Sequence, residues 1–504
     1  MTEGDYAALC AACDRLLRSP ATSLERIAIS LLHVINEHPA GLRQYQPVLQ
    51  PTGPESLRPA LRRQSRALAR VARAFVTRAR PLLPPATFED PHPAATVLIV
   101  SHLTSPAQLG GADDFYFGAL QRLLQERGVR SLLVLVDHLR DDAARRACRA
   151  QLLEGTRRLL PQRVPGAVET RLWRGCLDAA RQLRREALAC GSGPEGALAV
   201  LASQQVLLGS TIANLRLHAA IRDLCRRLQP DIIITTHEGD ACERMIWHAA
   251  RATARPPLCV GYQHTRLTQH AHAIRRAIGP NPAGCDPDVI LTLGENSHAM
   301  LAQSPQLRPV QLITYGSHRR VATAQTVSRE YRARGCLVLP DADESECVFL
   351  FGFAADCARC DPDLDFVFRP HPATDFKALQ ARYPALRALP ANVTLSSAHA
   401  LEEDCRRMRY CLYRGSSAAV HAVLLGLKPF YVARPRELAF DPLFELQEWR
   451  ETVHSSQQFQ DGVRRAELLP DPSAAWRAWR HCDRAVASVR PAALDELLRL
   501  LPRR

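Results

Sequence analysis

The stretch Asp231–Thr236 (DIIITT), followed directly by His237-Glu238-Gly239-Asp240, decides the fold class of this chain. Its apolar run is continuous and rich in β-branched residues, which is typical of a strand buried on both faces of a parallel sheet. The polar residues and the glycine after it are typical of the turn between such a strand and a following helix. The segment therefore predicts a parallel sheet with helices on both faces.

Similar runs recur along the chain, each followed by a helical stretch, and the series restarts after a join near 315–335. The strands predicted before the join are Ala95–Val100, Ser131–Val136, Leu258–Tyr262 and Val289–Leu293, and those after it are Cys336–Leu339, Asp365–Phe368, Asn392–Leu395, Tyr410–Tyr413 and Pro429–Val432. This alternation predicts an α/β protein with two tandem doubly wound, Rossmann-like domains.

Length and proline placement set the expected domain boundaries. A chain of 504 residues is too long for a single core, and prolines cluster between 81 and 93. We predict a helical N-terminal region over 1–90, a first Rossmann-like domain over 91–320, a second over 321–470 and a helical tail over 471–504. Within the N-terminal region, 57–83 has the pattern of a basic amphipathic helix, which is either packed with a solvated face or in contact with a membrane surface.

Charge and composition narrow the partners. The chain has 65 Lys+Arg and 51 Asp+Glu, a net charge of +14, which favours anionic partners such as nucleotides, phosphorylated sugars or an acidic membrane face. Aromatic residues are only 6% and do not interleave with basic ones, so we expect no nucleic-acid partner. No apolar run approaches the about 18–20 residues of a membrane span. The acidic start, Met1–Asp5, is unlike a signal peptide, and we expect a cytoplasmic protein.

Two segments after predicted strands of the second domain have the character of a phosphate site. In Arg369-Pro370-His371-Pro372 the prolines stiffen a loop that presents a guanidinium and an imidazole, both of which bind phosphate oxygens. The segment Arg414-Gly415-Ser416-Ser417 opens a helix, where hydroxyl and amide groups make a phosphate cradle without a metal. The alternatives are a structural histidine beside a turn and a serine that caps the helix.

The first domain supplies candidates for acid–base chemistry. In His237-Glu238-Gly239-Asp240, Glu238 is placed to abstract a proton from a hydroxyl, or else Glu238 or Asp240 caps the next helix. Other polar residues expected at the same sheet edge are Gln263, His264, Gly110, Gly111 and Asp113.

Several cofactor classes are not expected. The chain lacks the phosphate-binding loop of nucleotide triphosphatases and a Gly-x-Gly-x-x-Gly after the first strand. Asp341 and Asp343 follow a strand at the ligand-binding end, but a helix cap explains them better than a divalent metal does. We therefore expect neither metal nor cofactor.

These residues resemble a known class, the GT-B-fold glycosyltransferases. The acidic-Gly, His-Pro and Ser-Ser motifs are similar to those of bacterial sialyltransferases and capsular Kdo transferases, which use CMP-activated sugars. The segment from Glu238 to Arg244, with Gly261 to His264, looks like a family of surface-carbohydrate biosynthesis proteins. The His-Pro and Ser motifs also resemble the CDP-glycerol glycerophosphotransferases. The families often carry another acid where this chain has His237.

The resemblance implies roles for individual residues. Glu238 would be the general base, His371 would contact the donor phosphate, and Ser416 and Ser417 would hold it. The expected activity is metal-independent transfer of a sugar, CMP-activated in the closest motifs, to a glycan or glycolipid acceptor for a bacterial surface polysaccharide. The donor would bind the second domain and the acceptor the first, with peripheral contact at the inner membrane face as an added expectation. A nucleotide-sugar 2-epimerase, a glycerophosphotransferase in which His264 also acts, and a non-catalytic binding relic are the alternatives.

Overall fold

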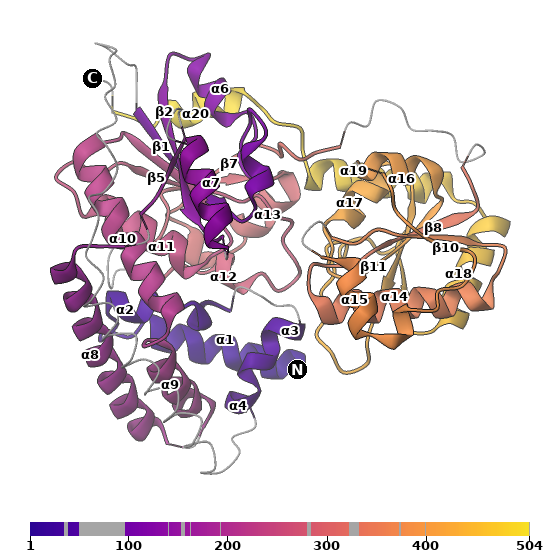
Figure 1. Cartoon of the computed structure of the whole chain (residues 1–504), viewed down its shortest axis with the longest axis horizontal. Helices are drawn as coiled ribbons and strands as arrows, with labels where there is room; N and C mark the ends of the chain where they lie inside the picture. The colour runs from indigo at the N-terminus through magenta and orange to yellow at the C-terminus, as the bar shows by residue number, and fades with distance from the viewer. Residues whose placement is uncertain are drawn as a thin grey trace.

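A computed structural model describes residues 1–34, 39–49, 96–139, 141–152, 157–161, 163–191, 193–279, 284–321, 332–371, 374–398 and 400–502. The basic stretch 57–83, with its predicted amphipathic helix, lies outside these residues. The described chain contains a seven-stranded and a six-stranded sheet, which lie in two separate halves of the molecule (Figure 1).

The first sheet has the strand order β3-β2-β1-β4-β5-β6-β7, and every neighbouring pair is parallel. All five residues of its central strand β4 are buried, as the continuous apolar run predicts. The strands are β1 (Thr96–Leu103), β2 (Arg130–Asp137), β3 (Arg157–Leu159), β4 (Ile232–Thr236), β5 (Leu258–Tyr262), β6 (Val289–Thr292) and β7 (Gln311–Thr314).

The second sheet repeats this plan in the order β10-β9-β8-β11-β12-β13, again with every pair parallel. In both sheets the chain starts in the interior, runs to one edge and then crosses back to build the other side. The expected pair of doubly wound, Rossmann-like domains is confirmed. The strands are β8 (Gly335–Leu339), β9 (Asp365–Phe368), β10 (Val393–Leu395), β11 (Tyr410–Tyr413), β12 (Lys428–Val432) and β13 (Glu451–Val453).

The crossover fixes where ligands bind in such a fold. The order reverses between β1 and β4 in the first sheet and between β8 and β11 in the second. Loops beyond the carboxyl ends of these strands part to opposite faces and leave a crevice. The segments after β4, β8 and β11 are therefore the positions from which side chains reach a ligand.

Helices cover both sheets and add a separate helical layer to the first. The helices are α1 (Glu3–Leu17), α2 (Leu24–Ile27), α3 (Pro39–Leu42), α4 (Gln46–Leu49), α6 (Leu120–Gln125), α7 (Asp142–Leu152), α8 (Gly166–Cys190), α9 (Pro194–Gln205), α10 (Gly209–Leu228), α11 (Ala241–Arg251), α12 (His272–Arg275), α13 (Glu295–Ala302), α14 (Glu344–Cys360), α15 (Phe376–Arg382), α16 (Leu401–Arg407), α17 (Ala418–Leu424), α18 (Ser456–Leu468), α19 (Pro472–Ala485) and α20 (Ala492–Leu498).

The N-terminal helices share one hydrophobic core with α8, α9 and part of α10, beside the first sheet (Figure 1). The C-terminal tail returns to the first domain, where Leu494 and Leu497 of α20 join the core under the strands. Among the described helices none alone is long and apolar enough to cross a membrane. The bent pair α9 and α10, at 66° to each other, reaches that criterion only when taken together.

Candidate functional site

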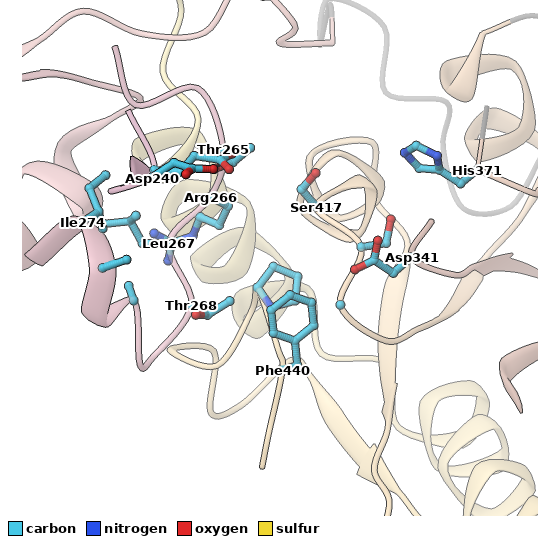
Figure 2. Close-up of a pocket in the computed structure, with 16 residues that line it drawn as sticks. Asp240, Thr265, Arg266, Leu267, Thr268, Ile274, Asp341, His371, Ser417 and Phe440 are labelled. Carbon is cyan, nitrogen blue, oxygen red and sulfur yellow. The ribbon is translucent and has the colours of Figure 1, made fainter. Parts of the chain in front are cut away.

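A cavity of about 560 Å³ lies between the two domains, at the carboxyl ends of their strands. Figure 2 shows its two walls, with Asp240 and Thr265 on one side and His371, Ser417 and Asp341 on the other. The lining residues are Glu238, Asp240, Thr265, Arg266, Leu267, Thr268, Ala271, Ala273, Ile274, Asp341, His371, Gly415, Ser416, Ser417, Phe440 and Pro442. The structure thus brings the acidic-Gly, His-Pro and Ser-Ser segments to one cavity.

The loop that carries Glu238 is held in place from behind by a buried carboxyl group. Glu243 lies in the first turn of α11, and its carboxyl oxygens accept hydrogen bonds from the backbone N–H groups of Glu238 (2.9 Å), Gly239 (2.8 Å) and Asp240 (2.9 Å). Gly239 has φ +91°, and a Cβ there would lie 2.3 Å from the Ala273 carbonyl carbon. The loop therefore needs glycine for conformation and for space.

The Glu238 carboxylate points into the cavity with two polar neighbours. The Thr265 hydroxyl donates to its Oε1 at 2.9 Å, and His264 Nε2 lies 3.5 Å from the same oxygen. The Glu238 side chain is 38% exposed, whereas that of His264 is 9% exposed. Burial lowers the pKa of His264, although the charge of Glu238 acts in the opposite direction. The His264 ring packs edge-on against Tyr116, 5.1 Å between centroids. A substrate hydroxyl can thus reach Glu238 beside a largely neutral imidazole.

His237 and Gln263, expected on the acceptor side, face the protein interior instead. Burial holds the pKa of His237 at about 3, and its Nδ1 lies 3.2 Å from Glu243. Gln263 is fully buried and connects the end of β5 to the segment after β6. Its amide oxygen accepts from the Leu293 N–H, and its amide nitrogen donates to the Ser297 hydroxyl. Both side chains shape the wall of the site from behind. A strand-end position alone does not tell whether a side chain points into the cleft.

The glycine loop after β1 lies outside the cavity lining. Gly110, Gly111 and Asp113 are exposed. The next residue, Asp114, is buried instead, where it accepts from the Ser101 hydroxyl and from the Phe117 backbone N–H. That contact folds the loop so that Tyr116 meets His264. The loop therefore reaches the site through Tyr116, which no motif in the sequence indicates.

The two serines form the opposite wall. Ser417 occupies the N-cap position of α17, but its side chain makes no capping hydrogen bond, and neither serine hydroxyl bonds to a described residue. Gly415 precedes them with φ +73°, and a Cβ there would lie 2.5 Å from the Phe440 ring. The hydroxyls are thus presented to the cavity instead of being used to cap the helix.

His371 and Asp341 stand beside the serines (Figure 2). Burial lowers the pKa of His371, whereas the Asp341 charge raises it. Asp343, the other member of the predicted pair, caps α14 by accepting from the backbone N–H of Ser345 at 2.9 Å. Within the described residues, no group of three or more His, Cys, Asp or Glu side chains is arranged to hold a metal.

Two arginines predicted for the phosphate site are instead engaged elsewhere. Arg369 Nη1 donates to Asp404 at 2.6 Å. Arg414, 1% exposed, is paired with Glu346 at 2.7 Å and with Glu437 at 2.6 Å. Neither arginine lines the cavity. An arginine at the end of a buried strand needs a carboxylate partner, and both side chains are used for that purpose.

A third carboxyl group, Asp240, lines the cavity beside Glu238. Its side chain caps α11 by accepting from the Cys242 backbone N–H at 3.3 Å. Burial, reinforced by the charge of Glu243, raises the pKa of Asp240 to about 7. This group can therefore be protonated near neutral pH. Sequence reasoning assigned it to helix capping alone.

Comparison with known proteins gives likenesses in fold. No family model and no curated protein matches the chain. Among solved structures it is similar to the glycosyltransferase SnogD from Streptomyces nogalater, at 15% identity over 81% of this chain and 100% of that one, with a TM-score of 0.46. It is also similar to UDP-GlcNAc 2-epimerase from Neisseria meningitidis, at 10% identity over 80% of this chain and 99% of that one, with a TM-score of 0.46. A third similar structure is MurG from Acinetobacter baumannii, at 11% identity over 81% of this chain and 99% of that one, with a TM-score of 0.44. At these values the likeness says nothing about activity.

Proposed function

We propose that the protein is a metal-independent glycosyltransferase that moves a sugar from a nucleotide-activated donor to a hydroxyl of a glycan or glycolipid. The observation that carries the proposal is that residues of both domains line one cavity. A carboxylate from one domain and a histidine with two serine hydroxyls from the other line it. Group transfer between two substrates needs a base for one and an anion site for the other.

The second domain would bind the donor. Ser416 and Ser417 offer two hydroxyl donors, and His371 adds an imidazole on the same wall. As the bond from sugar to phosphate breaks, negative charge grows on the leaving phosphate. Hydrogen-bond donors that are already in place stabilise that charge. Metal independence is part of the proposal because these groups need no cation to act.

The first domain would bind the acceptor. Glu238 would take the proton of the attacking hydroxyl while Thr265 fixes its Oε1. The second oxygen, Oε2, has no hydrogen-bond partner among the described residues and is the oxygen to which we assign the proton. Glu243 would act as a positioning residue, because it holds the loop through three backbone N–H groups.

The finer identity of the substrates is also proposed. Resemblance of the motifs favours a CMP-activated donor and a bacterial surface-polysaccharide acceptor. The net charge of +14 suits an anionic donor and an acidic membrane face. On this view the enzyme works in the cytoplasm, peripherally at the inner face of the membrane.

Binding and turnover measurements test the proposal. Calorimetry with CMP, CDP and UDP on the full chain, with and without a chelator, should give saturable binding of at least one nucleotide. The double variant Ser416→Ala/Ser417→Ala should lose it, while Ser455→Ala, which caps α18 far from the cavity, is the matched control. Absence of binding to all three nucleotides would reject the proposal.

Turnover separates this function from its alternatives. Incubation with a nucleotide sugar and oligosaccharide acceptors should release nucleotide only when an acceptor is present. Conversion of UDP-N-acetylglucosamine to its 2-epimer without an acceptor would identify an epimerase instead. Loss of activity on chelation would show that a metal takes part, and Asp341 would be the first position to replace.

A further inference from the structure

Arg319 is held at the point where the chain leaves the first domain. The Arg319 backbone N–H donates to the Ser317 hydroxyl at 3.1 Å. Ser317 N–H in turn donates to the Ala487 carbonyl at 2.9 Å, and the Tyr262 hydroxyl donates to the Gly316 carbonyl at 3.0 Å. The backbone of this segment is therefore tied both to the first sheet and to the C-terminal tail.

The Arg319 side chain lies on an aromatic platform. Its guanidinium carbon is 4.0 Å from the Phe115 ring centroid and 5.2 Å from that of Tyr116. Its Nε and Nη2 both donate to the Phe115 carbonyl, at 3.1 and 3.0 Å. These contacts fix the plane of the guanidinium and leave Nη1 with hydrogen-bonding capacity.

No carboxylate among the described residues forms an ion pair with Arg319, and the residue is exposed. Arg369 and Arg414 differ, since Asp404, Glu346 and Glu437 neutralise them. A guanidinium held in one plane without an ion-pair partner has its charge available for an anionic ligand.

The charge of Arg319 acts on both walls of the cleft. It lowers the pKa of His264 in the first domain, and it lowers the pKa of His371 and His421 in the second. Glu238 in turn acts on the guanidinium. Arg319 is not part of the cavity lining. Its guanidinium lies over Tyr116, whose ring is 5.1 Å from that of His264, and His264 Nε2 is 3.5 Å from Glu238 Oε1, so Arg319 stands beside the cavity on the side of the base.

We propose that Arg319 binds the phosphate of the nucleotide in this cleft and supplies positive charge from the first domain, because no Arg or Lys of the second domain is among the described residues that line the cavity. The inference rests on the proposed function. Two serine hydroxyls and a largely neutral histidine provide hydrogen bonds but no full charge. A guanidinium binds a phosphate with charge-assisted hydrogen bonds of about twice the neutral strength. The nucleotide would thus bridge the two domains.

Calorimetry on the full chain tests this role, with the tightest binder among CMP, CDP and UDP and its parent nucleoside. Arg319→Gln should weaken nucleotide binding about 10- to 100-fold and leave nucleoside binding within twofold. Arg319→Lys should recover part of the loss. The matched control is Arg320→Gln, because the neighbouring Arg320 is paired with Asp483 at 2.5 Å. Equal melting temperatures would show that each variant is folded.

Each other outcome overturns the inference in a distinct way. If Arg319→Gln binds nucleotide like the wild type while Ser416→Ala/Ser417→Ala does not, Arg319 is excluded and the proposed function stands. If Arg319→Gln weakens nucleotide and nucleoside equally, the residue shapes the cleft instead of binding phosphate. If the wild type binds none of the three nucleotides, the inference and the proposed function fail together.

Discussion

Acidification should destabilise the first domain through His237, the residue that stands where related motifs often carry an acid. The side chain is fully buried, 1% exposed, beneath the loop of Glu238. Its Nε2 has no hydrogen-bond partner among the described residues. Burial, with the charge of Arg244, lowers its pKa from 6.5 to about 3. Between pH about 6.5 and about 3, His237 is therefore protonated in the unfolded chain but not in the folded domain.

The expected magnitude follows from linkage between protonation and folding. Between pH about 6.5 and about 3 the unfolded chain binds a proton at His237 that the folded chain does not bind. Stability is therefore complete above the unfolded pKa and falls as the pH falls. At pH 5 the unfolded imidazole is almost fully protonated, which corresponds to a loss of about 2 kcal/mol relative to pH 7.

Urea unfolding at pH 7 and pH 5 measures the effect, followed by tryptophan fluorescence, since the Trp247 ring lies 5.0 Å from His237. His237→Asn should reduce the pH 7 to pH 5 difference by about 2 kcal/mol relative to wild type. His454→Asn, at an exposed position, should leave the difference unchanged. Equal pH dependence in wild type and His237→Asn would refute the account of a buried, neutral imidazole.

Three further results are expected. Glu238→Gln should lower turnover about 10²- to 10⁴-fold, the scale for a lost general base, with nucleotide affinity unchanged; turnover within a few-fold of wild type would exclude Glu238 as the base. Ser416→Ala/Ser417→Ala should weaken nucleotide binding by about 1–3 kcal/mol by calorimetry, and an unchanged dissociation constant would contradict the cradle. Gly239→Ala should lower the unfolding free energy by more than about 2 kcal/mol, since its Cβ would meet Ala273 backbone; a Tm equal to wild type would contradict this.

The sequence predicted the interior strands of both sheets and one edge strand, β10, and missed the other three edge strands. Interior strands such as β4 and β11 are continuous apolar runs because neighbours and helices surround them. The three strands that escaped prediction are β3, β7 and β13, each at the edge of its sheet. They are short and carry Arg, Gln or Glu, since one side of an edge strand meets solvent. Because the sequence does not show which strand such a segment pairs with, its pattern cannot be told from that of a loop.

Residues that line the cavity were predictable where backbone chemistry singles them out. Gly415 with its two serines and Gly239 beside Glu238 mark turns whose geometry presents side chains to the cavity. The positions of Arg369 and Arg414 outside the cavity were not predictable, because an arginine can bind a phosphate or a buried carboxylate equally well. Only the fold reveals that Arg414 meets Glu346.

An ion pair between the two domains lies beside the cavity. Arg266, which lines the cavity, pairs across the cleft with Glu445, and Glu445 pairs with His481 at 3.0 Å. Burial alone would raise the pKa of Glu445, but His481 and Arg266 outweigh it and hold the pKa below its ordinary value. The ion pair therefore persists at neutral pH and joins the two domains at the edge of the cavity. Glu238 lines the cavity from the first domain and the two serines line it from the second, so this ion pair is a direct link between the two walls that carry them.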